Sequence, residues 1–175
     1  MKLTRDEHLY FNACAKALLA CPEVQSMSAF TQHGRVSCLE HSLSVAYYSY
    51  WLCRRLRLRV DGESLIRGAL LHDFFLYDWH TVGRQYGLHG FTHPATALKN
   101  ARQRFRLSHK AENVIASHMW PLTLRRLPRC KEAAAGDFML IVQRKQFGNR
   151  QISGAVTGAV VTGSAGQAAF ARFFI

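Results

Sequence analysis

The sequence predicts an all-α fold, a single helical bundle followed by an irregular C-terminal tail. Apolar residues recur at helical spacing in successive segments, capping signatures precede several of them, and no convincing strand pattern occurs before about residue 147. The 175 residues, 49% of them hydrophobic, suffice for one domain with a substantial core. We therefore expect a helical domain over residues 1–147 and a Gly- and Ala-rich tail, aberrant or flexible, over 148–175.

The first helix is predicted by a capping box, in which Glu7 follows Thr4 by three residues. Apolar residues at helical spacing extend this helix to about Cys21-Pro22. Residues 23–36 indicate a short helix followed by a loop around His33-Gly34.

A second capping box, formed by Ser37 and Glu40, opens the next helix and places His41 near its start. The turn at Asp61-Gly62-Glu63-Ser64 begins a further helix, whose apolar run ends in His72 and Asp73. An imidazole beside a carboxylate at the end of an apolar helix is costly to bury unless both groups are paired or coordinated.

The second half of the chain predicts three more helices after a long connection that suits a lid or pocket wall. Thr92 is the expected N-cap of the first of them, with His93 and Pro94 in its first turn. Ser108 opens the next, which carries His118 on its apolar face and ends at Met119-Trp120-Pro121. A last helix is expected over about residues 131–146 and includes Asp137.

The charge of the chain predicts an anionic partner. The formal net charge is +12 and the pI is near 10.0, which suits a nucleotide, a phosphorylated metabolite or nucleic acid. The basic runs are divided among helix ends and loops, so nucleic acid is the less favoured of these partners.

Cysteine use and terminal composition predict a cytoplasmic protein. The five cysteines are scattered without a C-x-x-C pair, which fits a reducing compartment, and the first seven residues lack the apolar core of a signal peptide. Residues 151–171 carry no charge and contain Gly154 and Gly158 in a G-x-x-x-G pattern. Their glycines and polar residues disfavour insertion, so we expect no membrane segment.

The strongest functional signal is an ordered set of histidines and aspartates near predicted helix ends. Imidazoles and carboxylates are ligands for Mn, Fe, Co, Zn or Mg, and one aspartate can bridge two ions. Such a site activates a water for attack on phosphorus. Any one of these residues is more often structural than a ligand, so the prediction of one or two divalent ions depends on their joint order. The candidate ligands are His41, His72, Asp73, His93, His118 and Asp137.

This order, H…HD…H…H…D, resembles the HD superfamily of metal-dependent phosphohydrolases. The resemblance covers about residues 35–135. Within it, the segments 72–80, 88–94 and 118–121 are similar to small bacterial HD-domain hydrolases of undefined substrate. The resemblance implies an all-helical fold and cleavage of a phosphate ester of a nucleotide or other small metabolite.

The resemblance also implies roles for individual residues. His41, His72, Asp73 and a distal aspartate would hold one metal ion, and Asp73, His93 and His118 would complete a second. Asp73 is thus a candidate catalytic residue, and so is Asp78, which lies where some relatives place an acid that positions water or protonates the leaving group.

The sequence departs from the family after Asp137, which is followed by Phe138-Met139-Leu140-Ile141 and then the Gly- and Ala-rich tail. Either Asp137 is the distal ligand in a divergent setting, or the reading frame has shifted near Ala133. Three functions therefore remain open at this point: a metal-dependent phosphohydrolase, a catalytically impaired module that binds a nucleotide or other anion in a regulatory role, and a basic nucleic-acid-binding protein.

Overall fold

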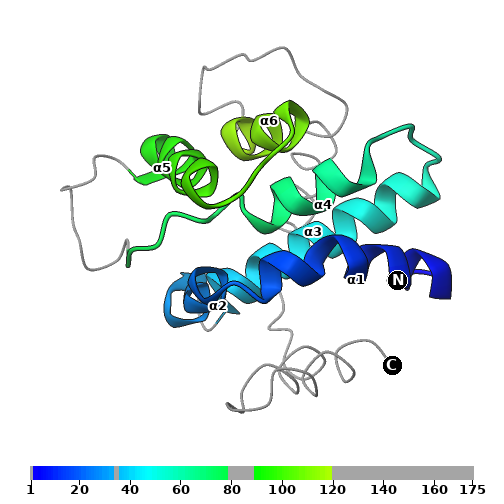
Figure 1. Cartoon of the computed structure of the whole chain (residues 1–175), viewed down its shortest axis with the longest axis horizontal. Helices are drawn as coiled ribbons and strands as arrows, with labels where there is room; N and C mark the ends of the chain where they lie inside the picture. The colour runs from blue at the N-terminus through cyan, green and yellow to red at the C-terminus, as the bar shows by residue number, and fades with distance from the viewer. Residues whose placement is uncertain (1, 34–35, 79–88, 120–175) are drawn as a thin grey trace. The chain divides into compact units, whose positions relative to one another are not determined.

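The computed structural model is helical, which confirms the predicted all-α class (Figure 1). It describes residues 2–33, 36–78 and 89–119. These ranges contain α1 (Arg5–Leu19), α2 (Pro22–Ser26), a 3-10 turn η1 (Met27–Ala29), β1 (Thr31–His33), β2 (Val36–Ser37), α3 (Cys38–Arg55), α4 (Gly62–Leu70), α5 (His89–Arg104) and α6 (His109–Ser117).

Both predicted capping boxes form. The Thr4 hydroxyl accepts a hydrogen bond from the Glu7 amide, while the Glu7 carboxylate accepts one from the Thr4 amide at 2.9 Å. Ser37 and Glu40 make the same reciprocal pair at the start of α3. Each box satisfies amide groups that have no partner inside the helix, so these two starting points follow from local chemistry.

Helix α4 is the centre of the fold, and it packs against α1, α3 and α6 (Figure 1). Asp61 caps it by accepting from the Ser64 amide. Its apolar residues are buried almost completely, with Leu65 and Ile66 both at 0% exposure. Burial of this face holds the end of α4 inside the molecule, which brings the residues that follow it into the core.

The region before α3 contains a short antiparallel hairpin, β1–β2, where the sequence predicted a loop. Thr31 pairs with Ser37, and His33 pairs with Val36, with an irregularity between the two pairs. Strands of three and two residues are too short to show an alternating pattern, which explains why the hairpin was missed.

Helix α5 begins at His89, three residues before the expected N-cap at Thr92, so that cap assignment was wrong. Pro94 consequently lies inside the helix, where it lacks the amide that would bond to residue 90. The cap of α6 was predicted correctly, because the Ser108 hydroxyl accepts from the Ala111 amide at 3.1 Å.

Several predictions lie outside the described residues. They concern the connection over 79–88, the last helix over about 131–146 with Asp137, the boundary near residue 147 and the tail over 148–175. Among the helices of the described ranges, none is long and apolar enough to cross a membrane.

Candidate metal centre

The centre of the candidate site is the turn that follows α4. His72 and Asp73 lie in this turn and are 1% and 2% exposed. Asn100 supports the same turn, because its amide donates to the carbonyls of Phe74 and Phe75, both at 3.1 Å. An imidazole and a carboxylate are therefore held inside the core, away from the solvent that would normally stabilise them.

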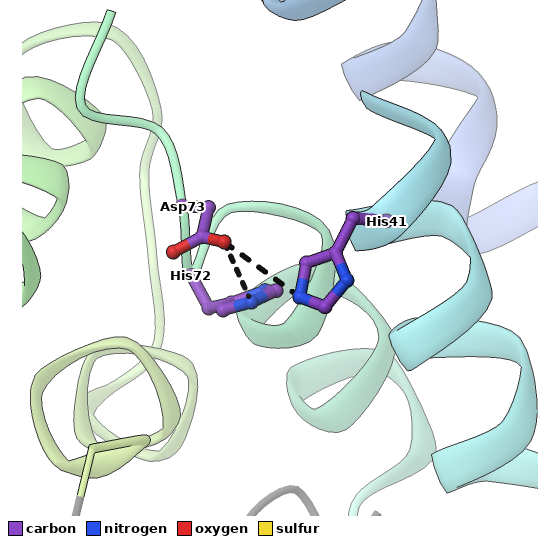
Figure 2. A group of neighbouring side chains, drawn as sticks. All are labelled: His41, His72 and Asp73. Carbon is purple, nitrogen blue, oxygen red and sulfur yellow. Dashed lines mark ion pairs between the residues drawn. The ribbon is translucent and has the colours of Figure 1, made fainter. Parts of the chain in front are cut away.

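His41, from the first turns of α3, meets one oxygen of Asp73. Its Nε2 lies 3.7 Å from Asp73 Oδ2, and His72 Nε2 lies 3.2 Å from the same oxygen. Figure 2 shows the two imidazoles directed toward this oxygen. The helix α3 and the end of α4 thus bring three potential ligands together.

His93 of α5 and His118, the C-cap of α6, meet the other oxygen of Asp73. Their Nε2 atoms lie 3.4 and 3.7 Å from Asp73 Oδ1. The two Nε2 atoms are 2.7 Å apart, within hydrogen-bonding distance of each other. Asp73 therefore stands between two pairs of imidazoles, one pair at each of its oxygens.

Backbone carbonyls determine which ring nitrogen of two of these histidines faces the site. His72 Nδ1 lies 2.7 Å from the Ala69 carbonyl, and His118 Nδ1 lies 2.8 Å from the Ile115 carbonyl. A carbonyl only accepts, so each Nδ1 carries a proton and donates. In the neutral rings the Nε2 lone pairs then point toward Asp73, which is the usual arrangement of metal-ligating histidines.

The donor set fits a metal ion. Asp73 Oδ1 is buried and accepts no hydrogen bond from any residue that the structure describes. Two ligand triads, His41–His72–Asp73 and Asp73–His93–His118, each have their ligand atoms within 4.8 Å of one another. Ligands about 2.1 Å from one ion are separated by about 3.0 to 3.4 Å, depending on geometry, close to most of the spacings observed. A cation bound between them would offset the repulsion between the lone pairs of the Asp73 oxygens and those of His72 Nε2 and His118 Nε2.

The electrostatics of the site favour the ligand forms of two of these residues. Burial would raise the pKa of Asp73, but the neighbouring His72, His118 and His41 hold that pKa well below its usual range. Burial, together with His72 and His93, holds the pKa of His118 well below its usual range. At neutral pH Asp73 is thus a carboxylate and His118 a neutral imidazole, the states that metal binding requires.

His72 differs in the direction of its shift. Burial lowers its pKa, but the charge and hydrogen bond of Asp73 and the Ala69 carbonyl outweigh burial, so the pKa is raised. The Asp73 carboxylate thus favours a positive charge at this position, which a proton or a metal ion can supply.

The two aspartates predicted outside this cluster have different outcomes. Asp78 is partly buried and lies near enough to Cys38 for its charge to contribute to the raised pKa of that thiol. Its role as an acid stays a prediction. Asp137 lies outside the described residues, so its assignment as the distal ligand also stays a prediction.

The sequence did not point to Gln32, which contacts Asp73, or to Cys38, which contacts Gln32. Gln32 Nε2 donates to Asp73 Oδ2 at 2.7 Å, and the Cys38 thiol donates to Gln32 Oε1 at 3.4 Å. Gln32 precedes Asp73 by 41 residues. No local sequence pattern distinguishes Gln32, because a glutamine shortly before a helix is usually an ordinary surface residue.

In the comparison with known families, the model of a family described as HD domain matches residues 38–135, more than half of the chain. The matched range contains every candidate metal ligand except Asp137, and it also contains Asp78. No curated protein and no solved structure matches the chain.

Proposed function

The chain belongs to the HD-domain family, and we propose that it is a metal-dependent phosphohydrolase that cleaves a phosphate ester of a nucleotide or small phosphorylated metabolite. Proteins of this family are generally metal-dependent hydrolases. The observation that carries the proposal is the placement of Asp73, whose two oxygens each face a separate pair of imidazoles in the core.

Each ligand residue has a definite part in this proposal. His41 and His72 would hold one divalent ion with Asp73 Oδ2, and His93 and His118 would hold a second with Oδ1. Bound divalent ions supply a water of lowered pKa and polarise the phosphoryl oxygens. The protein fixes the ligands before substrate arrives, because the Ala69 and Ile115 carbonyls orient two of the four rings.

Asp78 is the proposed acid of the site. It lies five residues after Asp73 and is partly buried. A carboxyl group there would position the attacking water or give a proton to the leaving alcohol. The variant Asp78→Asn is expected to retain its bound metal and lose about 100- to 10,000-fold in kcat, the usual contribution of general acid–base catalysis. An unchanged kcat would remove Asp78 from the mechanism.

The net charge of +12 supports an anionic substrate but does not distinguish among phosphate esters.

The test begins with metal analysis of the purified protein. A panel of nucleotides, sugar phosphates and other phosphate esters is then assayed with Mn²⁺, Co²⁺ or Mg²⁺. We expect bound metal and phosphate release from at least one substrate.

The matched variants for this assay are His72→Ala and His109→Ala. His72 is buried in the site, whereas the His109 side chain on α6 is fully exposed. Activity should be abolished in the first variant and unchanged in the second. Absence of bound metal, or turnover that survives His72→Ala, would contradict the proposal. Thermal stabilisation by a nucleotide without product would instead support the regulatory module.

A further inference from the structure

We propose that Gln32 is a positioning residue that holds the Asp73 carboxylate in the orientation that divides its oxygens between the two histidine pairs, and that Cys38 fixes the Gln32 amide for this task. The inference rests on the proposed metal centre and adds to it two residues that lie outside the ligand set.

The contact between Gln32 and Asp73 is direct and shielded from water. Gln32 is 8% exposed, Asp73 is 2% exposed, and the amide nitrogen lies 2.7 Å from Asp73 Oδ2. A hydrogen bond to an ionised carboxylate is about twice as strong as one between neutral groups. Apart from contacts with the four histidines, the Gln32 amide is the one side-chain hydrogen-bond donor to the Asp73 carboxylate among the residues that the structure describes.

The amide can be assigned its direction because Gln32 is held at both ends. The Cys38 thiol lies 3.4 Å from Gln32 Oε1, and an S–H group donates to a carbonyl oxygen. Burial, with the charges of Asp73 and Asp78, raises the pKa of Cys38 to about 12, so the thiol keeps its proton. With Oε1 engaged by Cys38, the NH₂ group faces Asp73. The reverse orientation would place two oxygens against each other.

The hairpin is what places Gln32 and Cys38 side by side. Strands β1 and β2 pair in antiparallel fashion, and the Cys38 amide donates to the Phe30 carbonyl at 2.8 Å. Gln32 thus projects from the hairpin, while Cys38 is the first residue of α3. The hairpin, which the sequence did not predict, therefore positions Gln32 between Cys38 and Asp73.

The consequence for the metal centre follows from the freedom of a carboxylate to rotate about its Cβ–Cγ bond. Donation to Oδ2 alone opposes that rotation and leaves Oδ1 directed toward His93 and His118. Without Gln32, the carboxylate is free to rotate out of the plane in which each oxygen faces its own pair of histidines. Loss of Gln32 should therefore weaken metal binding and reduce the number of ions bound.

The test is a Co²⁺ titration of the metal-free full-length chain, followed by the visible absorption of the bound ion and by calorimetry. Gln32→Met keeps the length of the side chain and removes the donor. We expect metal affinity to fall about 10- to 100-fold, the usual cost of losing an outer-shell partner, with an altered absorption spectrum. The control is Gln25→Met, which removes the exposed amide that donates to the Leu19 carbonyl and should change neither quantity.

Cys38 supplies a second pair of variants that keeps the inference testable if Gln32→Met does not fold. Cys38→Ser retains a donor and should keep the metal affinity. Cys38→Ala removes the donor, frees the amide to flip, and should cost roughly two- to fivefold. Circular dichroism of the metal-free variants checks that each is folded.

The outcomes separate this inference from the proposed function. If the wild-type protein binds Co²⁺ and the folded Gln32→Met variant binds it with the same affinity and spectrum, Gln32 has no positioning role, while the metal centre stands. Equal binding by Cys38→Ser and Cys38→Ala would likewise contradict the inference and leave the metal centre in place. If the wild-type protein binds no Co²⁺, both the proposed function and this inference are wrong.

Discussion

Two buried carboxylates, Glu7 and Asp73, differ in the groups that surround their oxygens. Glu7 is 9% exposed, and its oxygens accept from the Thr4 amide and from the guanidinium groups of Arg54 and Arg55, at 2.9 to 3.1 Å. Asp73 is 2% exposed, faces four imidazoles, and has one oxygen without a hydrogen bond in the described part of the chain.

The partners of each carboxylate indicate its task. Both carboxylates have a lowered pKa, so a depressed pKa alone does not distinguish them. Glu7 is fully paired and ties α1 to the end of α3, which is a structural task. Asp73 is paired with groups that are themselves metal ligands, and a buried oxygen without a donor is costly unless a cation binds it.

The largest expected effect comes from Asp73→Asn. We expect metal affinity to fall by more than about 100-fold, because the amide has no charge and Asp73 serves both ligand triads. Wild-type protein should gain about 2.7 kcal/mol of stability at a metal concentration 100 times its Kd, and at that concentration the variant should gain less than about 0.4 kcal/mol. Thermal melts with and without Co²⁺ measure this. An equal metal-induced rise in melting temperature in the variant would show that Asp73 is not a metal ligand and does not differ from Glu7 in this respect.

The next effect is on the number of ions. His118→Ala removes one ligand from the Oδ1 side and leaves the His41–His72 pair intact. We expect the calorimetric stoichiometry to fall from two ions to one, with the remaining site within about tenfold of its original affinity. A stoichiometry of one in the wild-type protein would show that the two oxygens of Asp73 serve a single ion.

A packing change tests whether the site depends on the approach of α4 to α6. A Cβ at Gly68 would lie 2.7 Å from Val114 Cβ and 2.9 Å from the Ala111 carbonyl, so Gly68→Ala must push the helices apart. We expect a loss of about 1 to 3 kcal/mol in the free energy of unfolding, measured by urea denaturation, together with weaker metal binding.

Gly62→Ala is the matched control on the same helix. A Cβ there meets the ring atoms of Tyr10 and Tyr50 at 3.1 and 3.2 Å, which can yield more easily than backbone. The variant should lose less stability than Gly68→Ala and keep its metal affinity. Equal losses in both would show that the α4–α6 contact has no special part in the site.

The smallest effect is expected from Glu7→Gln, at about 1 to 2 kcal/mol of unfolding free energy with no change in metal affinity. Burial raises the pKa of Glu7, but Thr4, Arg54 and Arg55 outweigh burial and lower it below 4.5. Its contribution is therefore present above about pH 4.5 and lost as the pH falls through the lower folded-state pKa. Denaturation of both proteins from pH 7 to pH 3 measures this, and a difference that grows on acidification would contradict it.

Much of the local structure could be predicted because it depends on residues three or four positions apart. The caps at Thr4, Ser37 and Ser108 are bonds to nearby amides, and the structure has all three. The start of α5 was misplaced at Thr92 because a proline two residues after a good capping residue resembles a helix start, even though the helix begins earlier.

Periodicity, caps and motif order are properties of the amino-acid sequence. The helical class, most helix boundaries and five of the candidate metal ligands could therefore be identified from the sequence alone. Those residues are His41, His72, Asp73, His93 and His118. How their side chains meet is a matter of tertiary packing. The division of the Asp73 oxygens, the ring orientations set by backbone carbonyls and the contact with Gln32 join four helices and a hairpin. Such contacts depend on packing between segments distant in the chain, and no local pattern encodes them.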